Sequence, residues 1–177
     1  MMGKVISIGK QDFASLREND YFFVDKTKFI KEWWENGDDI TLITRPRRFG
    51  KTLNMSMLEC FFSMKYKAQG NLFEGLSITK EEKKTKHHAT YPHKAITKAA
   101  VKADNLEDAK TQIKQQISKV YAENRYLLQG DTLSEKEREA YEKMDASVSD
   151  AEAIDALNNI SMYLCRYYGK KVIILLD

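Results

Sequence analysis

Residues 41–56, which read TLITRPRRFGKTLNMS, constrain this chain more than any other stretch. The run ITLIT at 40–44 is β-branched and apolar and stops just before Pro46, which predicts a short buried strand. After Lys51, apolar residues recur at helical spacing and predict an amphipathic helix. A buried strand followed by a Gly-Lys-Thr turn and a helix is typical of a loop that binds phosphate.

The turn departs from the usual phosphate-loop pattern of Gly, four residues and Gly-Lys-Ser/Thr, because Arg45 stands at the first glycine position. A residue before proline is pushed into extended conformations, so we expect the strand to run through Arg45 and the turn to start at Pro46. Pro46 has no N–H and removes one backbone donor, while Arg45, Arg47 and Arg48 add positive charge. We therefore expect a reduced set of backbone donors flanked by arginines.

Backbone N–H groups around the start of the helix are the predicted phosphate donors. They belong to Arg48, Phe49, Gly50, Lys51 and Thr52. An anion there would lie at the positive end of the helix dipole, and Gly50 would let the backbone approach it closely. Lys51 would reach the β- and γ-phosphates, and the Thr52 hydroxyl would bind Mg²⁺. The expected ligands are therefore ATP and Mg²⁺, and the competing interpretation is a basic turn before a helix.

The second part of the predicted site lies in residues 170–177, which read KKVIILLD. The apolar run at 172–176 predicts a strand buried on both faces. Asp177 follows directly, as expected of an acidic residue that holds Mg²⁺ through water. Lys51 and Asp177 are thus the predicted catalytic residues, and Thr52 and Asp177 the predicted metal contacts. Strand, helices and strand in this order predict a parallel α/β sheet.

Further elements are predicted by local patterns. They are a short helix that Asp25 would cap and that carries Phe29, Ile30, Trp33 and Trp34, a solvated connection at 78–88, a poor edge strand near 92–101, a helix at 106–125, and helices that begin with the capping boxes Ser134/Glu137 and Ser149/Glu152. Gly37 is expected in a turn, and Gly169 is expected to end the last helix.

The composition is that of a globular protein and excludes several classes. Hydrophobic residues make up 42% and charged residues 31% of 177 residues, and the net charge of +3 does not demand a polyanionic partner. No run is apolar enough for a membrane span or a signal peptide, so we expect no membrane association. Cys60 and Cys165 lie within apolar helical patterns and are expected to be buried free thiols, which suits the cytoplasm.

The sequence resembles the bacterial AAA-ATPase-like family over nearly its whole length. The matching stretches are IGKQDFASLRENDYFFVDKTKFI at 8–30, TLITRPRRFGKTLNMSML at 41–58, LFEGLSI at 72–78, TYP at 90–92 and YGKKVIILLD at 168–177. The resemblance implies an α/β fold of the P-loop NTPase type, with three layers and a mostly parallel sheet that is incomplete at the C-terminus. It also implies that the arginines around Pro46 belong to the family's own loop.

By this resemblance, residues 1–177 are the N-terminal part of one domain. Residues 1–38 would be a helical and aromatic segment, and residues 39–177 would be the core up to the strand that ends at Asp177. Members of the family usually continue with a glutamate, further strands and often a nuclease-like domain of the PD-(D/E)XK type. We therefore expect a fragment that binds ATP and Mg²⁺ with little hydrolysis. Nucleic-acid or protein partners would bind through regions absent from this chain.

Two other functions compete with ATP binding. A nucleic-acid-binding module would use the loop arginines and Lys51 to contact a phosphodiester backbone, with affinity that falls steeply as salt rises. A phosphotransferase would need an acceptor site and a lid, and no residue indicates either.

Several other residue groups have competing interpretations. Cys60, His87, His88 and His93 lack the spacing of metal ligands, so exposed imidazoles are expected. Tyr21, Phe22, Phe23, Trp33 and Trp34 could stack on adenine, but core packing is the more frequent use of such residues. Asp25 and Lys26, within FVDKT, match the family's pattern and would lie near the nucleotide in one interpretation; helix capping explains Asp25 in the other.

Overall fold

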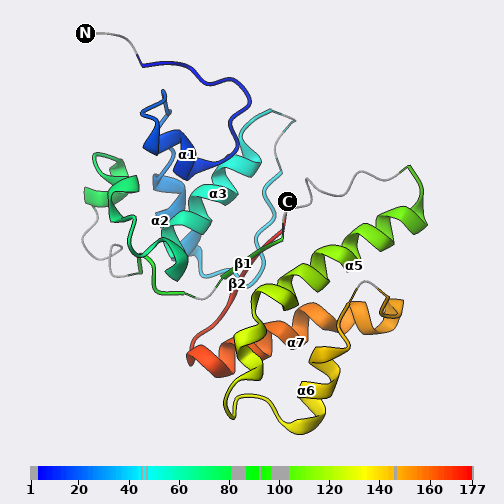
Figure 1. Ribbon diagram of the computed structural model, residues 1–177. Helices are drawn as coiled ribbons and strands as arrows, with labels where there is room; N and C mark the ends of the chain where they lie inside the picture. Colours follow the sequence, from blue (N-terminus) through cyan, green and yellow to red (C-terminus); the bar gives the residue numbers. More distant parts are fainter. Residues whose placement is uncertain are drawn as a thin grey trace. The chain divides into compact units, whose positions relative to one another are not determined.

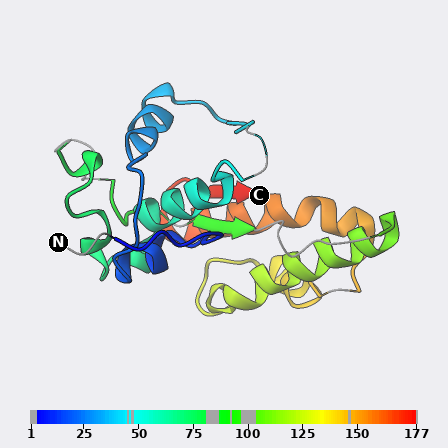
Figure 2. The same ribbon diagram turned by 90° about the horizontal axis from the view of Figure 1, so that it is seen from above.

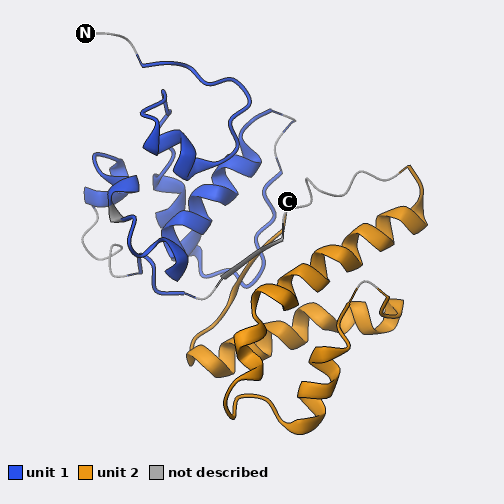
Figure 3. Cartoon of the chain, viewed as in Figure 1, with its two compact units in different colours: residues 1–93, 177 blue, residues 94–176 orange. Residues whose placement is uncertain are grey.

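The structure, a computed structural model, describes residues 4–44, 46, 48–80, 87–91, 93–96, 104–145 and 147–176 (Figure 1). The chain divides into two compact units, which Figure 3 shows in different colours. Unit 1 comprises residues 1–93 together with residue 177, and unit 2 comprises residues 94–176. Each unit has a buried core of its own, and each is described separately.

Unit 1 is a group of short helices and helical turns. Its elements are α1 (Phe13–Glu18), α2 (Lys28–Asn36), α3 (Lys51–Phe62) and the 3-10 turns η1 (Met64–Tyr66), η2 (Gly70–Phe73) and η3 (Ser77–Lys80). Local signals explain two of the helix ends. The Asp12 side chain accepts from the Ser15 N–H at the start of α1, and Gly37 ends α2 in the left-handed conformation.

Helix α3 is the centre of unit 1, and α1 lies beside it in both views (Figure 1 and Figure 2). The backbone N–H of Phe13 donates to Oγ of Ser56 on α3 at 3.0 Å. Phe13 is fully buried and stacks on Phe73 with the ring centroids 4.9 Å apart, and Phe61 meets Phe73 edge to face. These aromatic contacts bury large apolar areas and fix α3 against its neighbours.

Unit 2 is a helical unit with a short pair of strands. Its elements are β1 (His93–Ile96), α5 (Leu106–Glu123), η5 (Arg125–Leu128), α6 (Glu135–Glu142), α7 (Asp150–Tyr168) and β2 (Ile173–Leu176), with β1 starting at the last residue of unit 1. The two strands pair, and their arrows point the same way in Figure 2. Three tyrosines lie in the helical core, where the Tyr121 hydroxyl donates to the Ala156 carbonyl and the Tyr141 hydroxyl to the Tyr121 carbonyl, both at 2.8 Å.

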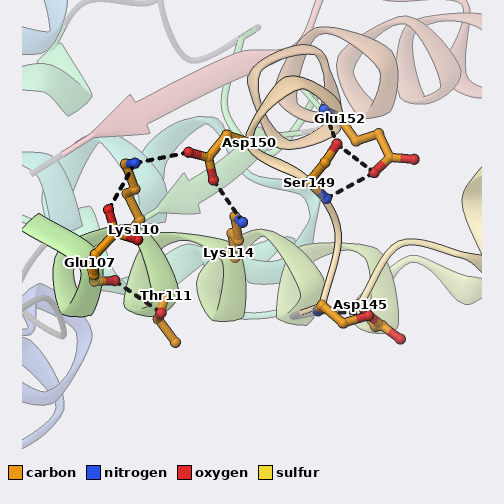
Figure 4. Close-up of polar contacts among 9 residues, drawn as sticks. Glu107, Lys110, Thr111, Lys114, Asp145, Ser149, Asp150 and Glu152 are labelled. Atoms are coloured by element: carbon orange, nitrogen blue, oxygen red, sulfur yellow. Dashed lines mark hydrogen bonds and ion pairs between the residues drawn. The ribbon is translucent and has the colours of Figure 1, made fainter.

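The start of α7 is tied to α5 by charge (Figure 4). Asp150, the first residue of α7, accepts from Nζ of Lys110 at 3.0 Å and from Nζ of Lys114 at 2.8 Å. Ser149 and Glu152 form the expected capping box, in which the Ser149 N–H donates to the Glu152 carboxylate at 2.8 Å. The capping box is local in sequence, whereas the two ion pairs join α5 to α7. Together they set where α7 begins.

The helix predictions are largely confirmed. The capping boxes at Ser134 and Ser149 are both present, Gly169 ends α7 in the left-handed conformation, and the helix expected at 106–125 is α5. The short helix after Asp25 is α2, although its N-cap is Thr27. The edge strand predicted near 92–101 is present as β1, while Pro92 and residues 97–101 lie outside the described residues.

The predicted fold class is wrong. The part of the chain that the structure describes is mostly helical, and its strands form one two-stranded sheet. A three-layer α/β fold needs a wider parallel sheet, each strand of which is covered on both faces. Two short strands cannot separate two layers of helices.

Two strand predictions illustrate the error. Residues 41–44 are not a strand, and Ile40 and Leu42 are 90% and 83% exposed. The strand at 173–176 exists as β2, but it is not buried on both faces, because Leu175 is buried while Leu176 is 62% exposed. A β-branched run becomes a buried strand only when other strands satisfy its backbone hydrogen bonds, and composition does not show whether they do.

The cysteine prediction is half right. Cys60 is buried in unit 1, and burial, with the nearby charges of Glu59 and Asp12, raises the pKa of its thiol to about 12. Cys165 is exposed on α7, so its expected burial is wrong. Helical periodicity failed here because Cys165 directly follows the buried Leu164 and faces away from the core. None of the helices in the described residues has the length and apolar character to cross a membrane.

Candidate functional site

The turn before α3 has an alternating backbone conformation. Arg48 has a φ of 68° and Gly50 a φ of 74°, while Phe49 between them has no positive φ. Successive residues that alternate between right- and left-handed conformations turn their N–H groups toward one side and form concave anion sites. A positive φ is strained for arginine and easy for glycine. Arg48 and Gly50 supply the left-handed positions that such a site requires.

Helix α3 starts at this turn as the sequence predicted. Gly50 is its N-cap, and the first helical bond runs from the Asn54 N–H to the Gly50 carbonyl at 2.9 Å. Glycine has no side chain with which to cap the helix, whereas side chains of Asp12, Asn105, Ser134 and Ser149 cap α1, α5, α6 and α7. The N-terminal end of α3 is thus built without the side-chain cap that those helices have.

The structure places five of the predicted site residues in one short stretch. Arg48 and Phe49 are exposed, and Gly50, Lys51 and Thr52 are half-buried, with Lys51 and Thr52 in the first turn of α3. Arg45, Arg47 and Asp177 lie outside the described residues, so the pairing of Lys51 and Thr52 with Asp177 stays a prediction. The strand expected before the loop is absent from residues 41–44, so the loop follows a non-regular segment.

The C-terminal half of α3 packs into unit 1 and holds the loop in place. Met57, Leu58 and Phe61 are buried, as their helical spacing predicted. Ser56 accepts the Phe13 N–H from α1, so residues at the N-terminal end of the chain hold the helix that carries Lys51. The first turn of α3 is only half-buried. A rigid base with an accessible first turn is the arrangement that a binding loop needs.

A second segment, FVDKT at 23–27, is fixed by the carboxylate of Asp25. One oxygen of Asp25 accepts from the Thr27 N–H at 2.9 Å and from the Thr27 hydroxyl at 2.6 Å. The other accepts from the Ser77 N–H at 2.7 Å and from the Ser77 hydroxyl at 2.6 Å. Thr27 is fully buried, and its hydroxyl accepts from the Ile78 N–H at 3.1 Å. We call these residues, Asp25, Thr27, Ser77 and Ile78, the Asp25 clamp.

The hydrogen bonds of the clamp lower the pKa of the Asp25 carboxyl. Partial burial raises the pKa of this carboxyl, but the hydrogen bonds from Ser77 and Thr27 outweigh it and lower the pKa from 3.8 to about 2. The carboxylate is thus held in its charged form. Sequence reasoning identified Asp25 as a helix cap or a nucleotide neighbour, but it missed Ser77, which lies 52 residues away and has no periodic signal of its own.

Lys26 lies between the clamped residues and extends to the loop. A Cβ atom placed on Gly50 would lie 3.9 Å from Nζ of Lys26. Lys26 is exposed, and its ammonium group makes no hydrogen bond or ion pair within the described residues. The structure therefore brings the FVDKT segment to the phosphate-loop candidate, although the two are more than twenty residues apart in the chain.

The aromatic residues of this region pack mainly against one another. Trp34 stacks on Phe62 with the ring centroids 5.3 Å apart, and Trp33 meets the same ring edge to face at 5.4 Å. Phe23 contacts Phe13 at 5.4 Å, whereas Phe22 is exposed. Trp33, Trp34 and Phe23 are half-buried and packed against other rings, and a role in stacking on adenine stays a prediction.

Two of the three histidines, His87 and His88, are not the exposed imidazoles that the sequence predicted. His87 and His88 are half-buried, and His87 lies against Trp34 with the ring centroids 4.5 Å apart. His88 packs against Phe61 and Phe73, its Nε2 atom is buried without a partner among the described residues, and burial lowers its pKa. The side chain of His93 is not described. In the described residues no three His, Cys, Asp or Glu side chains gather as metal ligands would.

Comparison with known proteins identifies a family for this chain. The model of a family described as "Predicted AAA-ATPase" matches residues 7–177. A stretch of 81 residues is 43% identical to an uncharacterised protein in the vnfD 5′ region of Azotobacter chroococcum mcd 1, and the match covers 44% of this chain and 14% of that protein. No solved structure matches the chain.

Proposed function

Because this chain belongs to the predicted AAA-ATPase family, we propose that residues 48–52 bind the phosphates of a nucleoside triphosphate, with ATP as the expected ligand. The observation that carries the proposal is the backbone of the turn. Positive φ angles at Arg48 and Gly50 lead directly into α3, whose N-cap has no side chain. Aligned peptide dipoles make such a helix start favourable for a phosphate group.

Each residue of the loop has a distinct role in this proposal. Gly50 lets the backbone approach a phosphate oxygen, and the Lys51 ammonium pairs with the phosphate charge. Thr52 supplies a hydroxyl oxygen, a donor type that suits Mg²⁺, from the half-buried first turn of α3. Mg²⁺, when bound, would neutralise part of the phosphate charge. Asp177 is proposed as the second residue on the metal side.

Titration with Mg-ATP tests this proposal. Lys51→Ala should weaken binding at least tenfold, because it removes a charge-assisted contact worth more than about 1.4 kcal/mol. Lys136→Ala is the matched control, since Lys136 is an exposed lysine on α6 in unit 2 and should leave the affinity unchanged. Binding can be followed by calorimetry. Equal affinities of the wild-type chain and Lys51→Ala would contradict the proposal.

Nucleic-acid binding is the outcome that would replace ATP binding. Duplex DNA and single-stranded RNA should then bind with an affinity that falls steeply as salt rises. Mg-ATP should fail to compete, because the loop would recognise a phosphodiester backbone. If Mg-ATP displaces the nucleic acid and Lys51→Ala weakens the binding of both ligands, the loop is a nucleotide site that also attracts polyanions.

The ATPase activity of the longer proteins in this family is a further proposal for the whole protein. This chain matches only 14% of the curated relative's length. Hydrolysis requires a positioned water in addition to bound nucleotide. Binding of Mg-ATP is therefore the property that the titration measures.

A further inference from the structure

We propose that Lys26 is a second phosphate-binding residue of this site, supplied by the FVDKT segment in addition to Lys51. The inference rests on the proposed nucleotide site and extends it, because Lys26 lies outside the loop that the Gly-Lys-Thr pattern defines. Its starting point is the short approach of the Lys26 ammonium to the loop, where a Cβ on Gly50 would be 3.9 Å from Nζ.

The position of Lys26 is set by its neighbours on both sides. Asp25 bonds to Ser77 through the Ser77 N–H and hydroxyl, and Thr27 is fully buried and accepts the Ile78 N–H. The backbone of Lys26 is therefore held at its two ends by contacts with η3. Its carbonyl also accepts the Phe29 N–H at 2.9 Å at the start of α2. A lysine on a fixed backbone loses less freedom when it binds a ligand.

The surroundings of Lys26 fit an anion better than a structural ion pair. Asp25 is the adjacent carboxylate, but both of its oxygens are engaged by Thr27 and Ser77. Among the described residues the Lys26 ammonium has no acidic partner. It lies instead beside Gly50, the left-handed N-cap at the positive end of α3, which directly precedes Lys51 in the chain. An ammonium group that has no acidic partner and lies beside the positive end of a helix is well placed to bind an anion.

The chemistry of the ligand follows from this arrangement. Two ammonium groups from different segments, together with the N–H groups of a turn, suit a chain of linked phosphates better than a single phosphate. We therefore expect Lys26 to contribute more to the binding of ATP and ADP than to the binding of AMP. Lys26 contacts the ligand in this proposal and so is a binding residue, while Asp25 positions it.

The test measures Mg-ATP, Mg-ADP and AMP affinities of the full chain, of Lys51→Ala and of three further variants by calorimetry. Lys26→Ala should weaken Mg-ATP binding about tenfold and lower its salt dependence, because one charge-assisted contact is lost. Lys26→Arg keeps the charge and should stay within about threefold of the wild type. Lys28→Ala is the matched control, since Lys28 is an exposed lysine two residues away at the start of α2, and it should bind as the wild type does.

The outcomes separate this inference from the proposed function. If Lys51→Ala weakens Mg-ATP binding while Lys26→Ala and Lys28→Ala both match the wild type, the nucleotide site stands and the role of Lys26 is refuted. Equal losses in Lys26→Ala and Lys26→Arg would also refute it, because the charge would not be what matters. If the wild-type chain binds no Mg-ATP, both proposals fall. Thermal unfolding of each variant checks that Lys26→Ala is folded.

Discussion

Arg48 has a left-handed backbone conformation, which a residue with a side chain rarely adopts. A φ of 68° is unfavourable for any residue with a Cβ atom and costs on the order of 1–2 kcal/mol. Such strain persists where the surrounding structure requires it, and it is concentrated at binding and catalytic sites. Among the described residues other than glycine, Asp20 and Ala89 also have positive φ, and Arg48 is the one that lies two residues before the N-cap of α3. The strained residue and the glycine after it therefore support the same conclusion as the Gly-Lys-Thr pattern.

His88 gives unit 1 a dependence on pH. Burial between aromatic rings lowers the pKa of His88 below its ordinary value of 6.5, so the folded protein resists protonation at this residue. The unfolded chain takes up the proton near pH 6.5. The stability that neutral His88 contributes is therefore fully present above about pH 6.5. It is lost as the pH falls toward the lowered pKa of the folded state.

Denaturant unfolding between about pH 8 and pH 5.5 measures this loss. His88→Phe and His88→Gln should both lose less stability over this range than the wild type, because neither side chain titrates there. The two variants differ in packing, so a shared effect reports on the charge. An unchanged pH dependence in both would show that protonation of His88 costs the fold nothing.

The Asp25 clamp is the contact that fixes the start of α2 to η3. Asp25 accepts four hydrogen bonds at 2.6–2.9 Å, two from Thr27 and two from Ser77, which lies 52 residues away. Helix α2 has no side-chain cap, so this carboxylate organises its entry in place of one. The same contacts hold the residues on either side of Lys26. One acidic residue thus links an element boundary to the candidate site.

Asp25→Asn should destabilise the chain, because the amide group cannot accept from all four donors. The loss should be limited to about 1–2 kcal/mol, because Asp25 is largely exposed to solvent. Asp38→Asn, which removes an exposed charge after α2, is the control. The difference between wild type and Asp25→Asn should be full above about pH 3.8 and should shrink as the pH falls toward 2. Chemical denaturation provides the measurement, and equal stabilities of the two variants would argue against the clamp.

The two compact units assign the candidate site and the helical core to different parts of the chain. The residues proposed to contact phosphate, at 26 and 48–52, belong to unit 1. The helices α5, α6 and α7 form their own core in unit 2. A ligand stabilises the part of a protein that it contacts. Nucleotide binding should therefore affect the units unequally.

Hydrogen exchange followed by mass spectrometry can detect this difference. Saturating Mg-ATP should slow exchange in the segments at 22–36 and 48–62 more than in α5 and α7, because local opening becomes costlier only where the ligand binds. AMP at the same concentration should protect less. Equal protection of α7 and α3 would instead mean that the ligand stabilises the whole chain or binds elsewhere.

Elements that depend on neighbouring residues in the chain were predictable from the sequence. Capping boxes at Ser134 and Ser149 and the turn glycines Gly37 and Gly169 act within a few residues, so their pattern carries the required information. The start of α3 at Lys51 was predictable for the same reason. The Gly-Lys-Thr pattern likewise identified the loop that the structure shows with alternating φ angles.

Elements that depend on distant partners were not predictable. The run at 40–44 has the residues of a strand, but no pairing makes it one, and β2 is covered less than its apolar sequence predicted. Ser77 joins Asp25, and Lys26 reaches Gly50, across separations that no periodicity encodes. Hydrogen bonds and charges act through space, whereas a pattern records only order along the chain. Local chemistry thus placed the loop and its helix, and tertiary contacts brought a second lysine to them.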